Sequence, residues 1–335
     1  MLFNPASTGD KGASSISFKA KSQWYSGETT PYNTGSLTFE ESLPCSILDY
    51  GLKITFDQEG DGLFQTIEAG ALLVATPSIR RYKTNHNFRI GADISWGIQS
   101  VNYSKLIFSD QLDPQFGVNK PTNFTPPNDG KSSIYFNPGF GVIYKGLFNV
   151  KSMKTQMLNI GLGIYNVYSL NSGLFSNSRS VLGLSAFESM KFTAFIEYEV
   201  IPYYNNNKFI SVKPLIFYQK QNNIQSTDIG ARVGLSKLIA LGVYFHFTDF
   251  EFTKNTGWIN LNAELGWKLN DNRRIDLSLS YCNNYSGLQN FAGLIFEFGL
   301  AYHFRKLTKS CGSPTKVNCS SFTSPKNKIY ENIWY

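Results

Sequence analysis

Acidic side chains stand at the spacing of a calcium-binding loop early in the chain. Positions 1, 3, 5 and 12 of such a loop are occupied by Asp57, Glu59, Asp61 and Glu68. In an EF-hand this spacing, with a glycine at position 6, surrounds Ca²⁺ with carboxylate oxygens between two helices. Here the flanking residues 52–56 and 67–75 alternate in hydrophobicity, as strands do. The alternative is therefore an acidic β-hairpin with an Asp-Gly turn.

Cysteine, histidine and serine offer little further chemistry. Cys311 and Cys319 are close enough in sequence to form a small disulfide loop in an oxidising compartment. The three histidines are scattered, and no CxxC or HxxxH spacing predicts a zinc site. No serine or cysteine lies in a nucleophile motif, and carboxylates such as Glu197 and Glu199 fit a hydrated wall better than a catalytic pair. We predict neither an enzyme nor a bound cofactor.

The tail, residues 305–335, carries most of the net charge. The whole chain has a formal charge of +7, and the tail's six cations and one anion supply +5 of it. The nearly neutral body argues against a nucleic-acid partner. The tail ends in apolar and aromatic side chains, which we expect either to fray or to form a segment that docks on a partner or plugs the fold. The candidate partner-binding residues are Tyr330, Ile333, Trp334 and Tyr335.

Composition and hydropathy identify the elements that must carry these residues. Of 335 residues, 42% are hydrophobic, 15% are aromatic and only 16% are charged, against about 25% charged in soluble domains. No apolar run approaches the roughly 18 residues of a transmembrane helix. Hydrophobicity instead alternates with period two. In residues 88–99, Phe88, Ile90 and Trp96 share one face, and Arg89 and Asp93 share the other.

The same alternation predicts strands along most of the chain. The fourteen predicted strands are residues 14–24, 36–42, 49–57, 65–76, 88–99, 134–145, 157–168, 191–201, 209–220, 228–236, 239–247, 258–269, 274–281 and 294–304. A soluble β-sandwich would show the same period, but its strands average nearer five or six residues. The strand length and the aromatics near strand ends favour a membrane barrel. We predict an all-β fold, a transmembrane antiparallel up-and-down β-barrel of about fourteen strands with a C-terminal non-barrel tail.

Connection lengths predict the orientation and the domain limits. Long connections follow the first, fifth and seventh strands, at residues 25–35, 100–133 and 169–190. Outer-membrane barrels have short periplasmic turns and longer outer loops, so both termini are expected in the periplasm. We therefore divide the chain into a periplasmic N-terminal segment (1–12), the barrel (13–304) and a periplasmic tail (305–335). The opening, MLFNPASTGDKG, resembles no signal peptide, so the protein is either not exported or shown in its mature form.

Several short motifs, in order, resemble the PorP/SprF family of type IX secretion system outer-membrane proteins. They are Asn4-Pro-Ala with Gly9, Gln23-Trp24, RIGADISWGI from Arg89, YSKLIFSDQLD from Tyr103, GLGIYN from Gly161 and KPLIFY from Lys213. The likeness spans about residues 1–304, and the tail with its cysteines departs from it. Membership implies a signal peptide before these residues and a place in the bacterial outer membrane, in contact with lipid and lipopolysaccharide.

The resemblance implies a function that composition does not show. It implies a barrel that binds, exports or anchors a secreted surface adhesin through the adhesin's C-terminal domain. It also implies contacts with periplasmic type IX secretion or gliding-motor proteins. The alternative is a porin or an uptake channel for a hydrophobic solute, and an outer-membrane enzyme is disfavoured because its motifs are missing.

Overall fold

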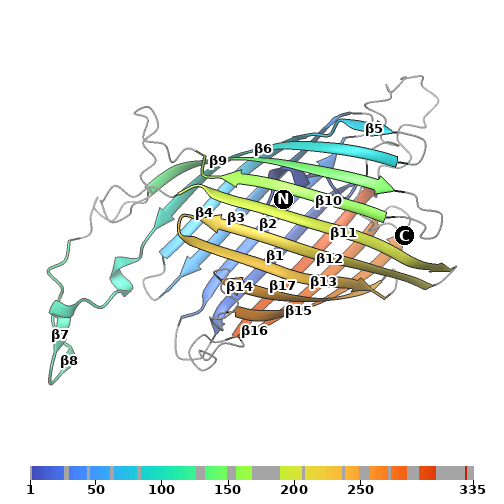
Figure 1. The fold of residues 1–335 in the computed structure, drawn as a ribbon. Helices are drawn as coiled ribbons and strands as arrows, with labels where there is room; N and C mark the ends of the chain where they lie inside the picture. The colour runs from blue at the N-terminus through green and yellow to red at the C-terminus, as the bar shows by residue number, and fades with distance from the viewer. Residues whose placement is uncertain are drawn as a thin grey trace.

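A computed structural model describes residues 2–25, 30–43, 46–60, 64–80, 84–125, 133–148, 156–167, 189–205, 208–235, 238–248, 257–270, 273–284, 294–306 and 329. In this part of the chain, fourteen long strands form the wall of a closed barrel (Figure 1). The wall strands are β1 (Ala13–Tyr25), β2 (Tyr32–Ser42), β3 (Leu48–Glu59), β4 (Phe64–Ala75), β6 (Thr84–Ser100), β9 (Ser133–Phe148), β10 (Gln156–Tyr165), β11 (Lys191–Asn205), β12 (Lys208–Gln221), β13 (Ile224–Gly234), β14 (Ile239–Thr248), β15 (Gly257–Asn270), β16 (Arg273–Asn284) and β17 (Leu294–Lys306). Each wall strand pairs antiparallel with the next, and β1 pairs with β17 to close the ring. This confirms the predicted antiparallel barrel.

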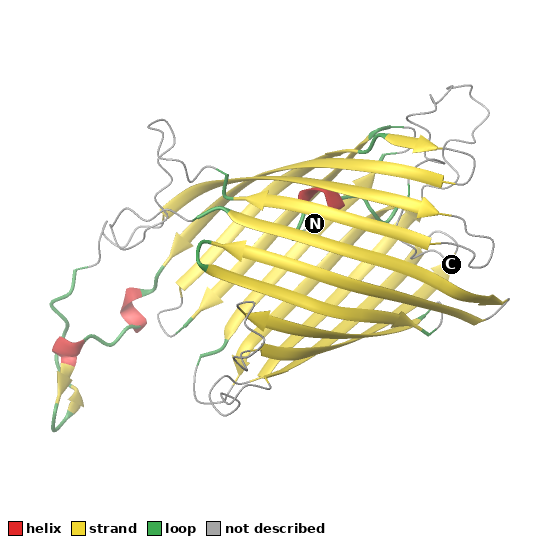
Figure 2. Ribbon diagram, in the orientation of Figure 1, coloured by secondary structure: helices red, strands yellow, loops and turns green. Residues whose placement is uncertain are grey.

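Smaller elements lie inside the barrel or beyond its ends. The short strand β5 (Ser78–Arg80) pairs with the start of β6, and the 3-10 helix η1 (Pro5–Ser7) lies within the ring of strands (Figure 2). The connection between β6 and β9 carries η2 (Tyr103–Lys105), η3 (Ser109–Gln111) and the hairpin β7 (Leu112–Asp113) with β8 (Gly117–Val118). We call its described residues, 101–125, the arm, because they project away from one end of the barrel (Figure 1). Among the described residues, no helix is long and apolar enough to cross a membrane.

The two faces of the wall have opposite chemistry, as the alternation in β6 shows. Ile90 and Trp96 are 55% and 57% exposed on the outer face, whereas Arg89 and Asp93 are buried on the inner face. Outward apolar side chains would be costly in water but suit a lipid-facing surface. The predicted faces of this strand are therefore confirmed, and the polar inner wall is where chemistry can take place.

Aromatic pairs mark two levels along the outer face. Phe88 packs against Tyr144 with ring centroids 5.3 Å apart, and Trp96 packs against Phe136 at 5.5 Å. Phe88 and Trp96 are separated by about 26 Å along β6, which is roughly 20 Å of membrane depth at the usual strand tilt. This spacing fits aromatic girdles on either side of an apolar band about 25 Å tall.

Candidate functional site in the lumen

Buried charges join neighbouring strands on the inner wall. Lys53 of β3 contacts Asp93 of β6 (Nζ–Oδ2 2.5 Å) and Glu68 of β4 (Nζ–Oε1 3.1 Å). Gly70 lies opposite Lys53, and a Cβ there would come within 2.9 Å of the lysine Cε. The glycine therefore leaves Lys53 room to reach across β4. Asn137 of β9 donates a hydrogen bond to Glu68 at 3.0 Å, which extends the network to a fourth strand.

The N-terminal segment, which we define as residues 2–12, packs against this inner wall. Asn4 caps η1 because its Oδ1 accepts a hydrogen bond from the Ala6 N–H at 2.9 Å. Pro5 follows at the first helical position, where its missing N–H costs nothing. The Asn4 Nδ2 donates to the backbone oxygen of Leu162 in β10 at 2.9 Å. Asn-Pro-Ala thus forms a short capped turn that is also bonded to the barrel wall.

Three glycines in adjacent strands form the floor beneath this turn. Gly91 of β6 lies opposite Gly141 of β9, which in turn lies opposite Gly163 of β10. A Cβ at Gly91 would lie 2.5 Å from the Ala6 nitrogen, and one at Gly141 would overlap the Asn4 amide. We call these residues the glycine row. Because glycine has no side chain, the backbone of the segment can approach the three strands closely at these positions.

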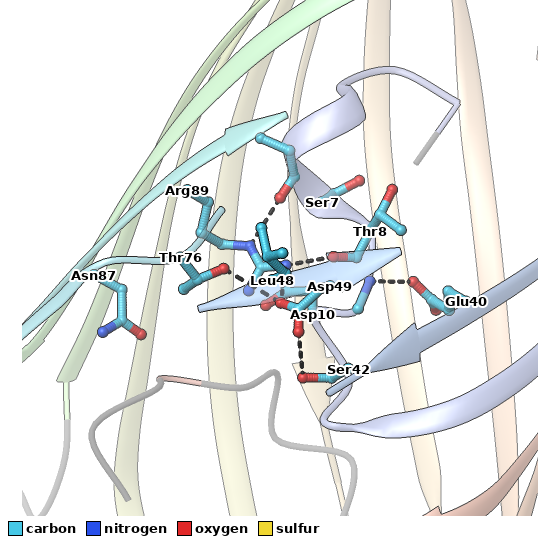
Figure 3. Close-up of polar contacts among 12 residues, drawn as sticks. Ser7, Thr8, Asp10, Glu40, Ser42, Leu48, Asp49, Thr76, Asn87 and Arg89 are labelled. Carbon is cyan, nitrogen blue, oxygen red and sulfur yellow. Dashed lines mark hydrogen bonds and ion pairs between the residues drawn. The ribbon is translucent and has the colours of Figure 1, made fainter. Parts of the chain in front are cut away.

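Arg89 binds the carbonyl groups of the segment (Figure 3). Its Nε donates to the Ala6 oxygen at 2.8 Å, and its Nη2 donates to the Thr8 oxygen. The same Nη2 pairs with Asp49 Oδ2 at 3.3 Å, and both side chains are fully buried. Asp49 also accepts hydrogen bonds from the hydroxyls of Ser42 at 2.7 Å and Thr76 at 3.2 Å. Arg89 therefore links the segment directly to Asp49 of β3 and, through Asp49, to the end of β2 and to Thr76 just after β4.

Further contacts hold both ends of the segment. The Thr193 hydroxyl of β11 donates to the Phe3 oxygen at 2.8 Å. The Gly9 N–H donates to Glu40 of β2 at 2.9 Å, and Asp10 forms an ion pair with the buried Lys145 of β9. These contacts come from strands on both sides of the glycine row, so the segment is bound along its length.

A cavity of about 370 Å³ occupies the other side of the lumen, against β1 and β11–β17. Its lining carries charges of both signs that pair across strands. Lys213 lies 3.4 Å from Glu197, and Arg232 lies 2.6 Å from Glu264. Lys11 of the N-terminal segment also lines this cavity. The segment thus lies between the glycine row and this cavity.

The arm is ordered by its own contacts. The rings of Phe108 and Phe124 stack with centroids 4.4 Å apart. The Asp110 carboxylate accepts hydrogen bonds from the Asn123 N–H at 2.6 Å and from the Thr122 hydroxyl at 3.0 Å. The Asn123 N–H is the main reason that the pKa of Asp110 lies below its usual range. The tip nevertheless leaves Phe116 70% exposed.

The structure does not bring the predicted calcium-binding residues together, and only Glu68 belongs to the buried charge network of the inner wall. Asp57 accepts a hydrogen bond from the Thr34 hydroxyl at 2.5 Å, Glu59 ends β3, and Glu68 pairs with Lys53 on the inner wall. Among the described residues, no three His, Cys, Asp or Glu side chains are grouped as metal ligands. The other predicted site residues lie outside the described residues: Asp61, Cys311, Cys319, Tyr330, Ile333, Trp334 and Tyr335.

One residue of the tail is described, and it reaches the inner wall. The backbone N–H of Ile329 donates to the Asn87 side chain of β6, and both residues are buried. Asn87 is two positions from Arg89 on the same face, so part of the tail and the N-terminal segment share this region. Sequence reasoning left a tail that plugs the barrel as one alternative, but it did not predict the luminal contacts of the N-terminal segment. The sequence does contain one usable signal for the segment, which is Asn-Pro-Ala together with glycines on three inner faces.

Comparisons with known proteins bear on the whole chain. The family model described as type IX secretion system membrane protein PorP/SprF matches residues 1–302. No curated protein matches. Among solved structures, the Ralstonia pickettii toluene transporter TbuX is 10% identical, with 91% of this chain and 92% of that chain covered and a TM-score of 0.43. The monoaromatic hydrocarbon channel CymD is 9% identical, with 91% of each chain covered and a TM-score of 0.44. A Pseudomonas aeruginosa FadL homologue is 11% identical, with 91% and 93% covered and a TM-score of 0.38.

Proposed function

Because the chain belongs to the PorP/SprF family of type IX secretion system membrane proteins, we propose that it binds, exports or anchors a secreted cell-surface adhesin. The adhesin is held through its C-terminal domain. The barrel spans the bacterial outer membrane, in contact with lipid and lipopolysaccharide. The strand ends that carry both termini face the periplasm, and the N-terminal segment turns from there into the lumen. In the periplasm, residues 305–335, including Tyr330, Ile333, Trp334 and Tyr335, contact periplasmic secretion or gliding-motor proteins. No catalytic step is assigned.

The arm is the observation that supports a binding role. Its backbone is held by contacts within the arm itself, which are the Asp110 hydrogen bonds and the Phe108–Phe124 stack. Its apolar side chains are left uncovered, with Ile107 64% and Val118 55% exposed. A preordered segment with uncovered apolar groups at the end of the barrel suits a protein partner. A passive channel gains nothing from such a segment.

Purification of the tagged barrel from native membranes tests the proposal. We expect an adhesin C-terminal domain to be recovered with the barrel, and Phe116→Ser to reduce that recovery. Ile224→Ser is a matched control, because Ile224 is 76% exposed at the same end of the barrel but lies outside the arm. Recovery of the barrel alone, together with a large ion conductance in planar bilayers, would instead support a porin or hydrophobic-solute channel.

A further inference from the structure

We propose that the glycine row and Arg89 form a binding site for an Asn-Pro-Ala peptide, which residues 3–10 of the chain fill as a ligand in cis. The bound segment blocks the part of the lumen that lies next to β6, β9 and β10. The proposal concerns the lumen alone and holds whatever protein the barrel handles.

The glycine row has the shape of a dedicated site. Glycine inside a strand costs about 0.5–1 kcal/mol relative to alanine. Gly91, Gly141 and Gly163 nevertheless occupy paired positions in three neighbouring strands. At each of them an added Cβ would meet the segment or a side chain that holds it. The row is explained by the close approach of a peptide backbone rather than by the needs of the wall.

The chemistry of the site is that of peptide recognition. Donors from the wall reach the carbonyl oxygens of Phe3, Ala6 and Thr8, which any peptide could supply. Specificity comes from Asn4, whose amide caps η1 and also binds the Leu162 oxygen. These contacts are made through side chains, unlike the continuous backbone pairing of the wall strands. The segment is therefore bound inside the barrel and is not a fifteenth wall strand.

Two glycines join the segment to β1. Gly9 and Gly12 have φ values of +76° and +60°, in the left-handed region that glycine adopts without strain. They turn the chain from the inner wall into the first strand. Between them, Asp10 is paired with Lys145, and Lys11 faces the cavity. The segment can therefore leave the site without any change in the pairing of β1.

Thiol labelling tests whether the glycine row holds the segment. Thr8 is fully buried, so in a background with the native cysteines changed to serine, the thiol introduced by Thr8→Cys should react slowly with a maleimide. Adding Gly141→Val should speed labelling by at least about tenfold, the effect of losing one strong hydrogen bond. Gly35→Val is the matched control, because a Cβ there meets nothing within 4 Å. Unchanged labelling, or equal acceleration by the control, would overturn the site.

A charge reversal provides a second test, should Gly141→Val fail to fold as judged by heat-modifiability on gels. Asp10→Lys faces the buried Lys145 with a like charge and should also speed labelling. Asp10→Lys combined with Lys145→Asp should restore slow labelling, and a double variant that labels as fast as the single one would contradict the assignment. Closure is tested in planar bilayers, where variants that release the segment should pass more current. Fast labelling with unchanged current would refute closure.

Discussion

Arg89→Met should test most directly what we call the luminal cluster, which is the set of buried charges Asp49, Lys53, Arg89 and Asp93 on the inner wall together with the N-terminal segment. Arg89 is fully buried, and it donates to two carbonyl groups of the N-terminal segment while pairing with Asp49. Methionine keeps most of the side-chain volume but removes the charge and all the donors. Asp49 would then be a buried carboxylate without its cationic partner, so the barrel should become less stable.

The size of the effect follows from the remaining contacts of Asp49. Removing one member of a buried ion pair costs about 3–5 kcal/mol. Asp49 still accepts hydrogen bonds from the Ser42 and Thr76 hydroxyls, so we expect the lower end, about 3 kcal/mol. Arg89→Met combined with Asp49→Asn leaves no unpaired charge, because asparagine is neutral. Its Oδ1 can still accept from the Ser42 hydroxyl, and its Nδ2 can donate to the Thr76 hydroxyl. The double variant should recover about 2 kcal/mol.

Guanidinium unfolding in lipid vesicles, followed by the fluorescence of the five tryptophans, measures both values. The free energy of unfolding comes from linear extrapolation to zero denaturant, with the slope compared between variants. If Arg89→Met stays within about 0.5 kcal/mol of the parent, as a surface substitution would, Arg89 does not hold the cluster together. A double variant that is no more stable than Arg89→Met would equally refute the reasoning about the Asp49 charge.

Two further predictions concern the arm and the closing seam of the barrel. The pKa of Asp110 is lowered mainly by the Asn123 N–H, so its ordering effect is present at neutral pH and is lost as pH falls through that lowered pKa. Cleavage of the arm by pepsin should rise only below pH 3.9, which is about the usual pKa of an aspartate. Asp110→Asn, which does not titrate, should show no such transition. At the seam, His303 lies between Ser15 (Nδ1–Oγ 2.7 Å) and Asp276 (Nε2–Oδ2 3.0 Å). His303→Leu should lower the free energy of unfolding by about 1–3 kcal/mol, whereas His303→Gln, which keeps a donor and an acceptor, should lose less in the same guanidinium assay.

Sequence periodicity was sufficient to predict the wall strands because the alternation of apolar and polar residues is present within each strand. A lipid face and a hydrated face alternate every second residue, so Ile90 and Arg89 are assigned to opposite faces without knowledge of any partner strand. Strand ends are less predictable. Paired strands continue beyond the membrane, where alternation is no longer required, and β2 begins at Tyr32 although apolar alternation suggests residue 36. The short hairpin of β7 and β8 has too few residues to show a period.

The luminal cluster depends on register between strands, which periodicity does not contain. Arg89 and Asp93 share a face, but residues four apart on a strand are about 13 Å apart. The actual partners are Asp49 for Arg89 and Lys53 for Asp93, each from β3. The glycine row likewise appears only once β6, β9 and β10 are aligned. We expected residues 1–12 to lie in the periplasm, and the extensive luminal contacts of residues 3–10 were not foreseen.

The attachment of the N-terminal segment to β1 has a consequence for the order of assembly. β1 is the first strand in sequence, and its pairing with β17, the last, completes the ring. In a chain in which β2 to β17 have already paired, β2 and β17 each still have an unpaired edge, and a gap separates the two edges. When β1 fills that gap, it brings the attached segment to the interior at the same step. In that order of pairing, sealing of the wall and filling of the lumen occur in one step, and a barrel still lacking β1 would be both open at its side and without the segment in its lumen.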